Sequence, residues 1–241
     1  MNYDETKNRC VEWIRGWFDR NGKGCPAVLG MSGGKDSTVA AALCAEALGK
    51  ENVTGVAMPA AGQGLNEADE ICRYLGIRYV CAPIDKIISS FDSIKSCITE
   101  EFSVQTEQNI PPRIRMTVLY AISQTVGGRV VNTCNLSEDW IGYATRWGDG
   151  VGDFSPLSGL TVEEIKGIGH AMGLPGRWVD KIPDDGLPHS CSDEEKFGFT
   201  YSVLDRYIRT GECEDPAVKA RIDSLHERNL FKMSMPEFFK P

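Results

Sequence analysis

The residues best suited to chemistry form one glycine-rich segment near the start of the chain. It reads Gly30-Met31-Ser32-Gly33-Gly34-Lys35-Asp36-Ser37. Glycines let the backbone turn tightly and bring amide N–H groups close to a ligand. The serine hydroxyls and the lysine ammonium add further donors for an anion. Asp36 suits an anion site only when a divalent cation accompanies the anion. The segment therefore predicts a site for nucleotide phosphates together with magnesium.

The flanking residues predict where this segment lies. Residues 26–31 (PAVLGM) form a short apolar run typical of a buried strand, and residues 38–48 (TVAAALCAEAL) are strong helix formers that end at Gly49. A helix that begins after the loop adds partial positive charge. The alternative is a simple glycine turn with an Asp/Ser helix cap, but S-G-G-x-D-S between a strand and a helix favours the phosphate site. No Walker pattern occurs.

The same alternation of strand and helix continues along the chain. Further strands are expected over residues 52–59, 77–84 and 129–133, and helices over residues 1–21, 66–75, 85–97, 111–126, 161–172, 200–209 and 215–229. Polar, glycine-rich segments over 138–160 and 183–193 are expected to be loops beside the site. The alternation predicts an α/β fold, a doubly wound parallel sheet with helices on both faces, in one domain spanning residues 1–241.

Composition restricts the classes of function. The net charge of −8 argues against broad binding of nucleic acid, which needs a basic face. Nine scattered cysteines without a C-x-x-C pair indicate reduced intracellular thiols rather than disulfides or a zinc site. No apolar run reaches the roughly 20 residues of a membrane span, and the polar N-terminus does not resemble a signal peptide. We therefore expect a cytoplasmic protein that binds neither nucleic acid nor membrane.

The glycine-rich segment resembles the pyrophosphate loop of the N-type ATP pyrophosphatases. These enzymes have an adenine nucleotide alpha-hydrolase-like fold and cleave ATP between the α and β phosphates. They include GMP synthetases, asparagine synthetases, tRNA thiolases and NAD synthetases. The resemblance thus implies the class of reaction before it implies the substrate.

Later segments resemble one branch of this superfamily, the ammonia-dependent NAD synthetases. These segments are Arg113–Met116, Thr133–Glu138, Gly142–Asp153 followed by Ser155-Pro156-Leu157, and Lys181–Leu187. Each alone would be an ordinary charged helix, strand end or polar turn. Together they keep the order and spacing of the family from about residue 10 to about residue 230.

The resemblance implies a role for particular residues. Those expected to bind ATP, with Thr133 and Asp184 facing the nucleotide, are Gly30, Met31, Ser32, Gly33, Gly34, Lys35, Asp36, Ser37, Thr133 and Asp184. Those expected to bind deamido-NAD are Arg113, Arg146, Asp153, His226 and Glu227. Those expected to hold Mg²⁺ are Asp36 and Glu138.

The implied reaction is the ATP-dependent amidation of deamido-NAD. ATP, the co-substrate, would adenylate the carboxylate, and ammonia would then displace AMP. The chain has no room for an added glutaminase domain, so free ammonia is the expected nitrogen source. The resemblance also implies a homodimer with deamido-NAD bound at the subunit contact, where the apolar side chains around Met116 and Tyr120 are as suited to the contact as to the core. The alternatives are a tRNA thiolase-like enzyme and a nucleotide-binding homologue impaired in catalysis.

Three positions depart from the family pattern. A lysine that meets ATP phosphates in the family falls at Val162, and a position that often holds serine or threonine is Asp184. Glu227 stands where a lysine follows the histidine that matches His226. The lysines able to replace the missing one are Lys35, Lys166 and Lys181, and the sequence does not choose among them.

Overall fold

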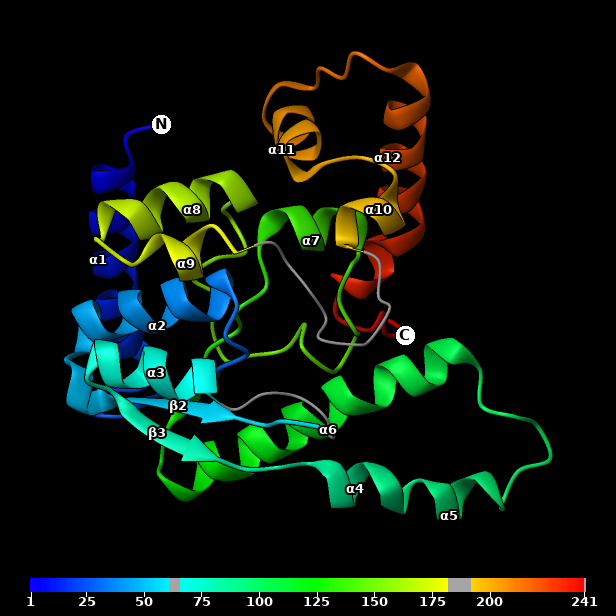
Figure 1. Cartoon of the computed structure of the whole chain (residues 1–241), viewed down its shortest axis with the longest axis horizontal. Helices are drawn as coiled ribbons and strands as arrows, with labels where there is room; N and C mark the ends of the chain where they lie inside the picture. Colours follow the sequence, from blue (N-terminus) through cyan, green and yellow to red (C-terminus); the bar gives the residue numbers. More distant parts are fainter. Residues whose placement is uncertain (61–65, 182–191, 241) are drawn as a thin grey trace.

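A parallel sheet lies at the centre of the chain. The computed structural model describes residues 1–60, 66–181 and 192–240. Within them the sheet has four strands in the order β3-β2-β1-β4, all parallel. Their bounds are β1 Ala27–Gly30, β2 Val53–Ala57, β3 Arg78–Cys81 and β4 Arg129–Val130. The predicted parallel α/β sheet is confirmed (Figure 1).

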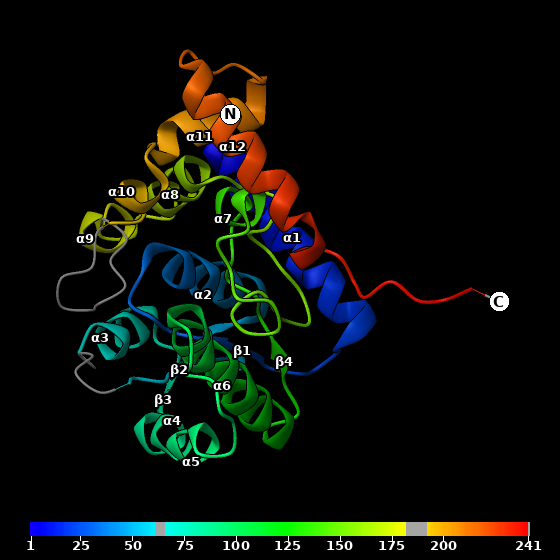
Figure 2. The same ribbon diagram turned by 90° about the vertical axis from the view of Figure 1, so that its right-hand side faces the viewer.

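Side chains alternate between the two faces of the sheet, and each face is covered by helices. Ala27 and Leu29 of β1 join one core cluster, whereas Val28 joins another. The first cluster packs the sheet against α1 (Tyr3–Asn21), α2 (Lys35–Leu48), α3 (Asn66–Leu75) and α8 (Val162–Ala171). The second packs it against α6 (Val104–Thr125), which lies on the opposite side from α2 in Figure 2. Both faces are thus buried, as parallel sheets require.

The strand order places a crevice beside β1. The chain runs from β1 to β2 and β3 on one side, then returns to place β4 on the other side of β1. Loops that leave β1 and β4 therefore separate in opposite directions at the carboxyl edge of the sheet. Ligands of open α/β sheets bind at such a switch point. The glycine-rich loop leaves β1 at this edge.

The remaining helices lie around this framework. The two short helices after β3 are α4 (Asp85–Ser90) and α5 (Asp92–Lys95). The second half of the chain adds α7 (Leu136–Ile141), α9 (Gly176–Val179), α10 (Asp193–Phe197), α11 (Tyr201–Thr210) and α12 (Pro216–Asn229). Two 3-10 turns are η1 (Lys50–Asn52) and η2 (Leu230–Lys232). Residues from α7, α8, α10, α11 and α12 share a third, smaller core.

Some predicted boundaries are wrong. The helix predicted over 111–126 begins at Val104, so Pro111 and Pro112 lie inside α6. Ser103 caps this helix by accepting a hydrogen bond from the Thr106 N–H at 3.1 Å. The two prolines remove two backbone donors, and the cap together with packing of the helix on the sheet offsets this loss.

Three other differences are smaller. The helix predicted over 85–97 is interrupted at Phe91, and α2 begins at Lys35 rather than Thr38. The short helices α7, α9 and α10 were not expected, because elements of four to six residues are too short to show a period. Among the described residues, no helix combines the length and apolar character needed to cross a bilayer.

Candidate active site

A cleft of about 770 Å³ opens at the carboxyl edge of the sheet, between the glycine-rich loop and α6. Loops after β1, β2 and β4 contribute to it, as do α3, α6 and α7. The predicted site residues that line it are Gly30, Met31, Ser32, Asp36, Ser37, Thr133 and Glu138. Residues more than a hundred positions apart in the sequence therefore meet in one site, as the strand order predicts.

The glycine-rich loop has the conformation of an anion cradle. Gly33 adopts a φ of +82°, which side chains other than glycine rarely tolerate. The Ser32 hydroxyl accepts a hydrogen bond from the Gly34 N–H at 3.2 Å and lies 3.2 Å from the Ser37 hydroxyl. Gly34 is the N-cap of α2 and supplies no side-chain cap. The start of this 14-residue helix thus faces the cleft without a protein side chain in the place of a ligand.

Lys35 does not line the cleft. Its side chain is 3% exposed, its Nζ lies 2.9 Å from Oδ2 of Asp36 and 5.8 Å from the ring centre of Tyr201. Burial opposes the charged ammonium, but the neighbouring carboxylates Asp36 and Glu138 outweigh burial, and the pKa of Lys35 is raised. Lys35 therefore stays charged and forms a buried ion pair with Asp36.

Asp36 and Glu138, the predicted metal ligands, are linked through one buried side chain. Asn135 donates from Nδ2 to Oδ1 of Asp36 at 3.2 Å and caps α7 by accepting the Glu138 N–H at 3.0 Å. Burial and then the charge of Asp36 raise the pKa of Glu138 well above its usual range. A cation bound between these two carboxylates would remove their mutual repulsion and stabilise their ionised forms.

The donor set fits magnesium held jointly with a nucleotide. Mg²⁺ is usually bound by one or two carboxylates, waters and substrate phosphates rather than by a complete protein cage. Within residues 1–60, 66–181 and 192–240, no cluster of three or more histidine, cysteine or acidic side chains is arranged to hold a metal ion. Asp36 and Glu138 beside the phosphate loop meet the simpler requirement.

Several cleft residues were missed by the sequence reasoning. These are Glu67, Arg115, Tyr120 and Asp149. The Arg115 Nε donates to the Met58 carbonyl at 3.1 Å, and burial lowers the pKa of this guanidinium. Asp149 accepts the Thr145 N–H at 2.7 Å, and burial raises the pKa of its carboxyl. Arg115 and Asp149 lie inside segments that carry the family resemblance, close in sequence to Arg113 and Arg146. This closeness in sequence was the only sign that they could belong to the site.

Most of the α6 side chains considered for a subunit contact face the cleft. Met116, Leu119 and Tyr120 all line it, and Ile122 packs against the core on the α6 face of the sheet. The helix thus forms one wall of the site.

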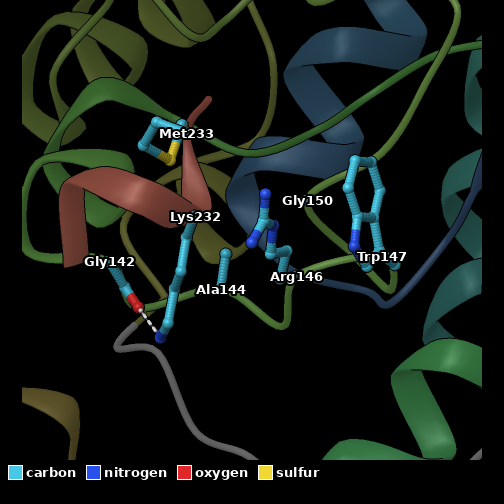
Figure 3. A pocket seen from close by; sticks show the side chains of 7 residues that line it. All are labelled: Gly142, Ala144, Arg146, Trp147, Gly150, Lys232 and Met233. Carbon is cyan, nitrogen blue, oxygen red and sulfur yellow. Dashed lines mark hydrogen bonds between the residues drawn. The ribbon is translucent and has the colours of Figure 1, made fainter. Parts of the chain in front are cut away.

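The residues expected to bind deamido-NAD do not line the cleft. Arg113 is exposed, and its Nε donates to the Arg146 carbonyl at 3.4 Å. Arg146 lines a separate, small cavity of about 40 Å³ (Figure 3). Its guanidinium lies over the rings of Trp147 and Phe231, 5.1 and 5.2 Å from their centres, and donates to the Ser234 carbonyl at 3.1 Å. The segment after α12 therefore covers Arg146.

The other members of this set make structural contacts. Asp153 accepts the Val130 N–H at 2.7 Å and the Tyr120 hydroxyl at 3.4 Å, so it joins the edge of β4 to α6. His226 stacks on Trp140 with ring centres 4.2 Å apart, and its Nδ1 lies 2.8 Å from the Trp140 carbonyl. Glu227 is exposed. Asp184, expected at the nucleotide, lies outside the described residues.

Position 162 is part of the core. Val162 is 1% exposed and packs in the third cluster, and its N–H donates to the Ser137 hydroxyl at 3.1 Å. The next N–H, that of Glu163, donates to Asp205 at 2.9 Å. The start of α8 is thus occupied by protein caps. Of the lysines considered as replacements, Lys181 lines the cleft, whereas Lys166 pairs with Glu163 at 2.9 Å on α8.

Comparison with known proteins shows the family. The family model described as NAD synthase matches residues 6–240. The curated NH(3)-dependent NAD(+) synthetase of Archaeoglobus fulgidus is 34% identical over 243 residues, which cover 98% of this chain and 96% of the relative.

Two solved structures extend the agreement to the fold. NMN synthetase from Francisella tularensis has a TM-score of 0.90 at 27% identity and covers 99% of this chain and 98% of its own. The NH3-dependent NAD synthetase from Campylobacter jejuni, solved with nitrate, has a TM-score of 0.79 at 29% identity over 100% of both chains. The predicted resemblance is confirmed, and the chain belongs to the NAD synthase family.

Proposed function

We propose that this chain is a ligase that converts deamido-NAD to NAD with ATP and ammonia. The observation that carries the proposal is the juxtaposition of Asp36 and Glu138 at one end of a phosphate loop, within a chain of the NAD synthase family. ATP binds along the loop, and the carboxylate to be activated enters from the α6 side of the cleft.

In the first step the protein mainly positions two anions. An oxygen of the deamido-NAD carboxylate forms a bond to the α-phosphorus of ATP, and pyrophosphate leaves with the electron pair of the broken bond. The amide groups of residues 32–34 and the start of α2 hold the phosphates. Asp36 and Glu138 would hold Mg²⁺, which neutralises phosphate charge when bound. Asn135 donates a hydrogen bond to Asp36 and caps the helix that carries Glu138.

In the second step ammonia attacks the carbonyl of the adenylated carboxylate. The N–C bond forms, AMP leaves with the electron pair of the acyl–oxygen bond, and a proton passes from nitrogen to solvent or to a neighbouring base. No nucleophilic side chain is required, because the mixed anhydride is already an acylating agent. The work of the site is to orient the reactants and exclude water.

The test is product formation by the purified protein. Mg-ATP, ammonium and deamido-NAD should give NAD, AMP and pyrophosphate in equal amounts. Omitting deamido-NAD should stop release of pyrophosphate. Pyrophosphate release that depends on transfer RNA instead would favour the thiolase-like alternative. Binding of ATP without any product would favour a homologue impaired in catalysis.

A second candidate acceptor is the mononucleotide precursor of NMN. Its support is the TM-score of 0.90 to an NMN synthetase, against 0.79 to an NH3-dependent NAD synthetase. The covering of Arg146 by residues 231–234 also fits an acceptor that lacks the adenylate half. Measuring kcat/KM for nicotinate mononucleotide and deamido-NAD in parallel decides between the two. A ratio above about ten in favour of the mononucleotide would replace the proposed acceptor.

The proposal includes an assembly and a location. We propose one domain over residues 1–241, a homodimer with the acceptor site near the subunit contact, and a cytoplasmic protein. The dimer is supported by exposed apolar side chains after α12, including Phe231, Met235, Phe238 and Phe239. Figure 2 shows this end of the chain extending away from the helices. Mass measured by light scattering during gel filtration tests the dimer.

A further inference from the structure

An acidic side chain lies directly against the phosphate loop. Glu67, in the first turn of α3, lines the cleft together with Ser32 and Asp36. A Cβ atom added to Gly33 would lie 2.9 Å from Oε2 of Glu67, so the carboxylate contacts the backbone at this glycine. Gly33 is correspondingly buried. A carboxylate in this place repels a polyphosphate unless a cation accompanies it.

That cation is Lys181. Its Nζ forms an ion pair with Oε2 of Glu67. Both side chains line the cleft, and both are partly exposed, at 40% for Lys181 and 36% for Glu67. Among the described residues that line the cleft, Lys181 is the one lysine. An ammonium group therefore lies at the phosphate loop in the absence of nucleotide.

The position of Lys181 is fixed by the helix that precedes it. Trp178 of α9 is buried and packs edge-on against Tyr74 of α3, with ring centres 5.1 Å apart. Arg177 pairs with Glu70 at 2.5 Å, one helical turn along α3 from Glu67. Two parallel ion pairs and an aromatic contact thus join α9 to α3. Only the pair formed by Lys181 and Glu67 reaches the cleft.

The other lysines considered have different partners. Lys35 is buried and holds Asp36. Lys166 lies on the surface of α8 and pairs with Glu163. Position 162 is a valine in the core. Of these positions, only Lys181 places an ammonium group in the cleft.

We propose that Lys181 binds the β- and γ-phosphates of ATP, exchanging its ion pair with Glu67 for one with the phosphates. The inference rests on the proposed function. As the bond from the acceptor carboxylate to the α-phosphorus forms and the bond to the bridging oxygen breaks, the electron pair stays on pyrophosphate. The Lys181 ammonium neutralises this charge and gives up no proton. Glu67 holds the ammonium at Gly33 before ATP binds and recaptures it after pyrophosphate leaves.

The test compares ATP with AMP, which lacks the phosphates in question. Affinities of the full chain are measured by calorimetry without acceptor, and kcat/KM for ATP is measured with acceptor and ammonium. Lys181→Gln should weaken ATP binding and lower kcat/KM for ATP about 100-fold, and leave AMP affinity and acceptor KM unchanged. Lys181→Arg should retain most of the ATP affinity. Glu67→Gln should leave ATP binding equal or tighter, because a competing negative charge is removed.

Arg177→Gln is the matched control, because it removes the parallel ion pair between the same two helices without touching the cleft. It should leave ATP and AMP affinities unchanged. Equal effects of Lys181→Gln and Arg177→Gln on ATP would overturn the inference, because Lys181 would then only join α3 to α9. Should Lys181→Gln fail to fold, Glu67→Gln decides instead. A clear loss of ATP affinity in Glu67→Gln would overturn the inference, because a carboxylate that competes with the phosphates for Lys181 cannot aid ATP binding.

Failure of the inference differs from failure of the proposed function. NAD formation that is unchanged in Lys181→Gln refutes the role of Lys181 and leaves the synthetase. ATP binding that depends on Lys181, without NAD formation, supports the role of Lys181 and refutes the synthetase. A chain that binds no Mg-ATP refutes both.

Discussion

Asn135 donates a hydrogen bond from its Nδ2 to Oδ1 of Asp36, 3.2 Å away. Asn135 lies after β4 at the start of α7, whereas Asp36 lies after β1 in the first turn of α2. Because Asn135 also caps the helix that carries Glu138, one fully buried amide fixes both predicted metal ligands. The geometry of the predicted metal site thus depends on a residue that is not itself a predicted ligand.

Asn135→Ala should therefore lower stability and metal-nucleotide affinity together. Loss of the helix cap and of a buried hydrogen bond should reduce the free energy of unfolding by about 2 kcal/mol. Urea unfolding measures this loss. Asn135→Ser keeps a side-chain oxygen that can cap α7 but is too short to reach Asp36, so it should retain more stability and still weaken Mg-ATP binding. Equal Mg-ATP affinity in all three proteins would contradict the link.

The stability of the free protein should decrease as the pH rises from 5 to 8. Burial raises the pKa of Asp139 from 3.8 to about 6, and burial followed by repulsion from Asp36 raises the pKa of Glu138. In this window the folded state holds protons that the unfolded chain has lost, so the free energy of unfolding falls as the pH rises, by about 1–3 kcal/mol.

Mg-ATP should reverse this trend, because a metal binds the ionised carboxylates. The additional stability from Mg-ATP should thus grow with pH. Urea unfolding at pH 5, 6, 7 and 8, with and without Mg-ATP, measures both trends. Glu138→Gln should flatten the dependence of the free protein and abolish most of the gain. A free protein whose stability rises over this range would contradict the assignment.

Val162→Ala should destabilise the protein without affecting the nucleotide. Removing two buried methyl groups from the core shared by α7, α8 and α11 should cost about 1–3 kcal/mol. The KM for ATP should stay unchanged, because the backbone N–H of residue 162 is already bonded to Ser137. A large rise in the KM for ATP at undiminished stability would show that position 162 contacts the nucleotide after all.

These results show which parts of the molecule the sequence could predict. Local patterns predicted the strand, loop and helix around Asp36 and the alternation of strands with helices. They could do so because each run of apolar residues matches a strand or one face of a helix. The start of α6 did not, because Pro111 and Pro112 normally mark a helix boundary. Packing on the sheet overrides that local preference.

The sequence predicted only part of the site, because some of its residues meet through long-range packing. Glu138 and Thr133 came from motifs, and the structure brings both to the cleft. Glu67 and Lys181 meet only through the docking of α9 on α3, a long-range contact that no local pattern encodes. The stacking of Arg146 under Phe231 is likewise set by the path of the chain after α12.

Arg146 should matter for the acceptor and not for ATP. If it binds a dinucleotide, Arg146→Gln should raise the KM for deamido-NAD about 10- to 100-fold, the value of a charge-assisted hydrogen bond, with the KM for ATP unchanged. Phe231→Ala removes one of its two stacked rings and should lower the KM for deamido-NAD by exposing the guanidinium. Unchanged kinetics with deamido-NAD in both variants would remove Arg146 from the acceptor site.

The most direct test of the central claim is formation of NAD by the purified chain. The protein is incubated with Mg-ATP, ammonium and deamido-NAD, and NAD, AMP and pyrophosphate are quantified together, with Asp36→Asn as the inactive control. We predict all three products in equal amounts with the unaltered protein. Without ammonium, no NAD should form and pyrophosphate should be released only slowly. Asp36→Asn should form none of the three products. Absence of NAD from a folded protein that binds Mg-ATP, with deamido-NAD and ammonium in excess, would contradict the claim.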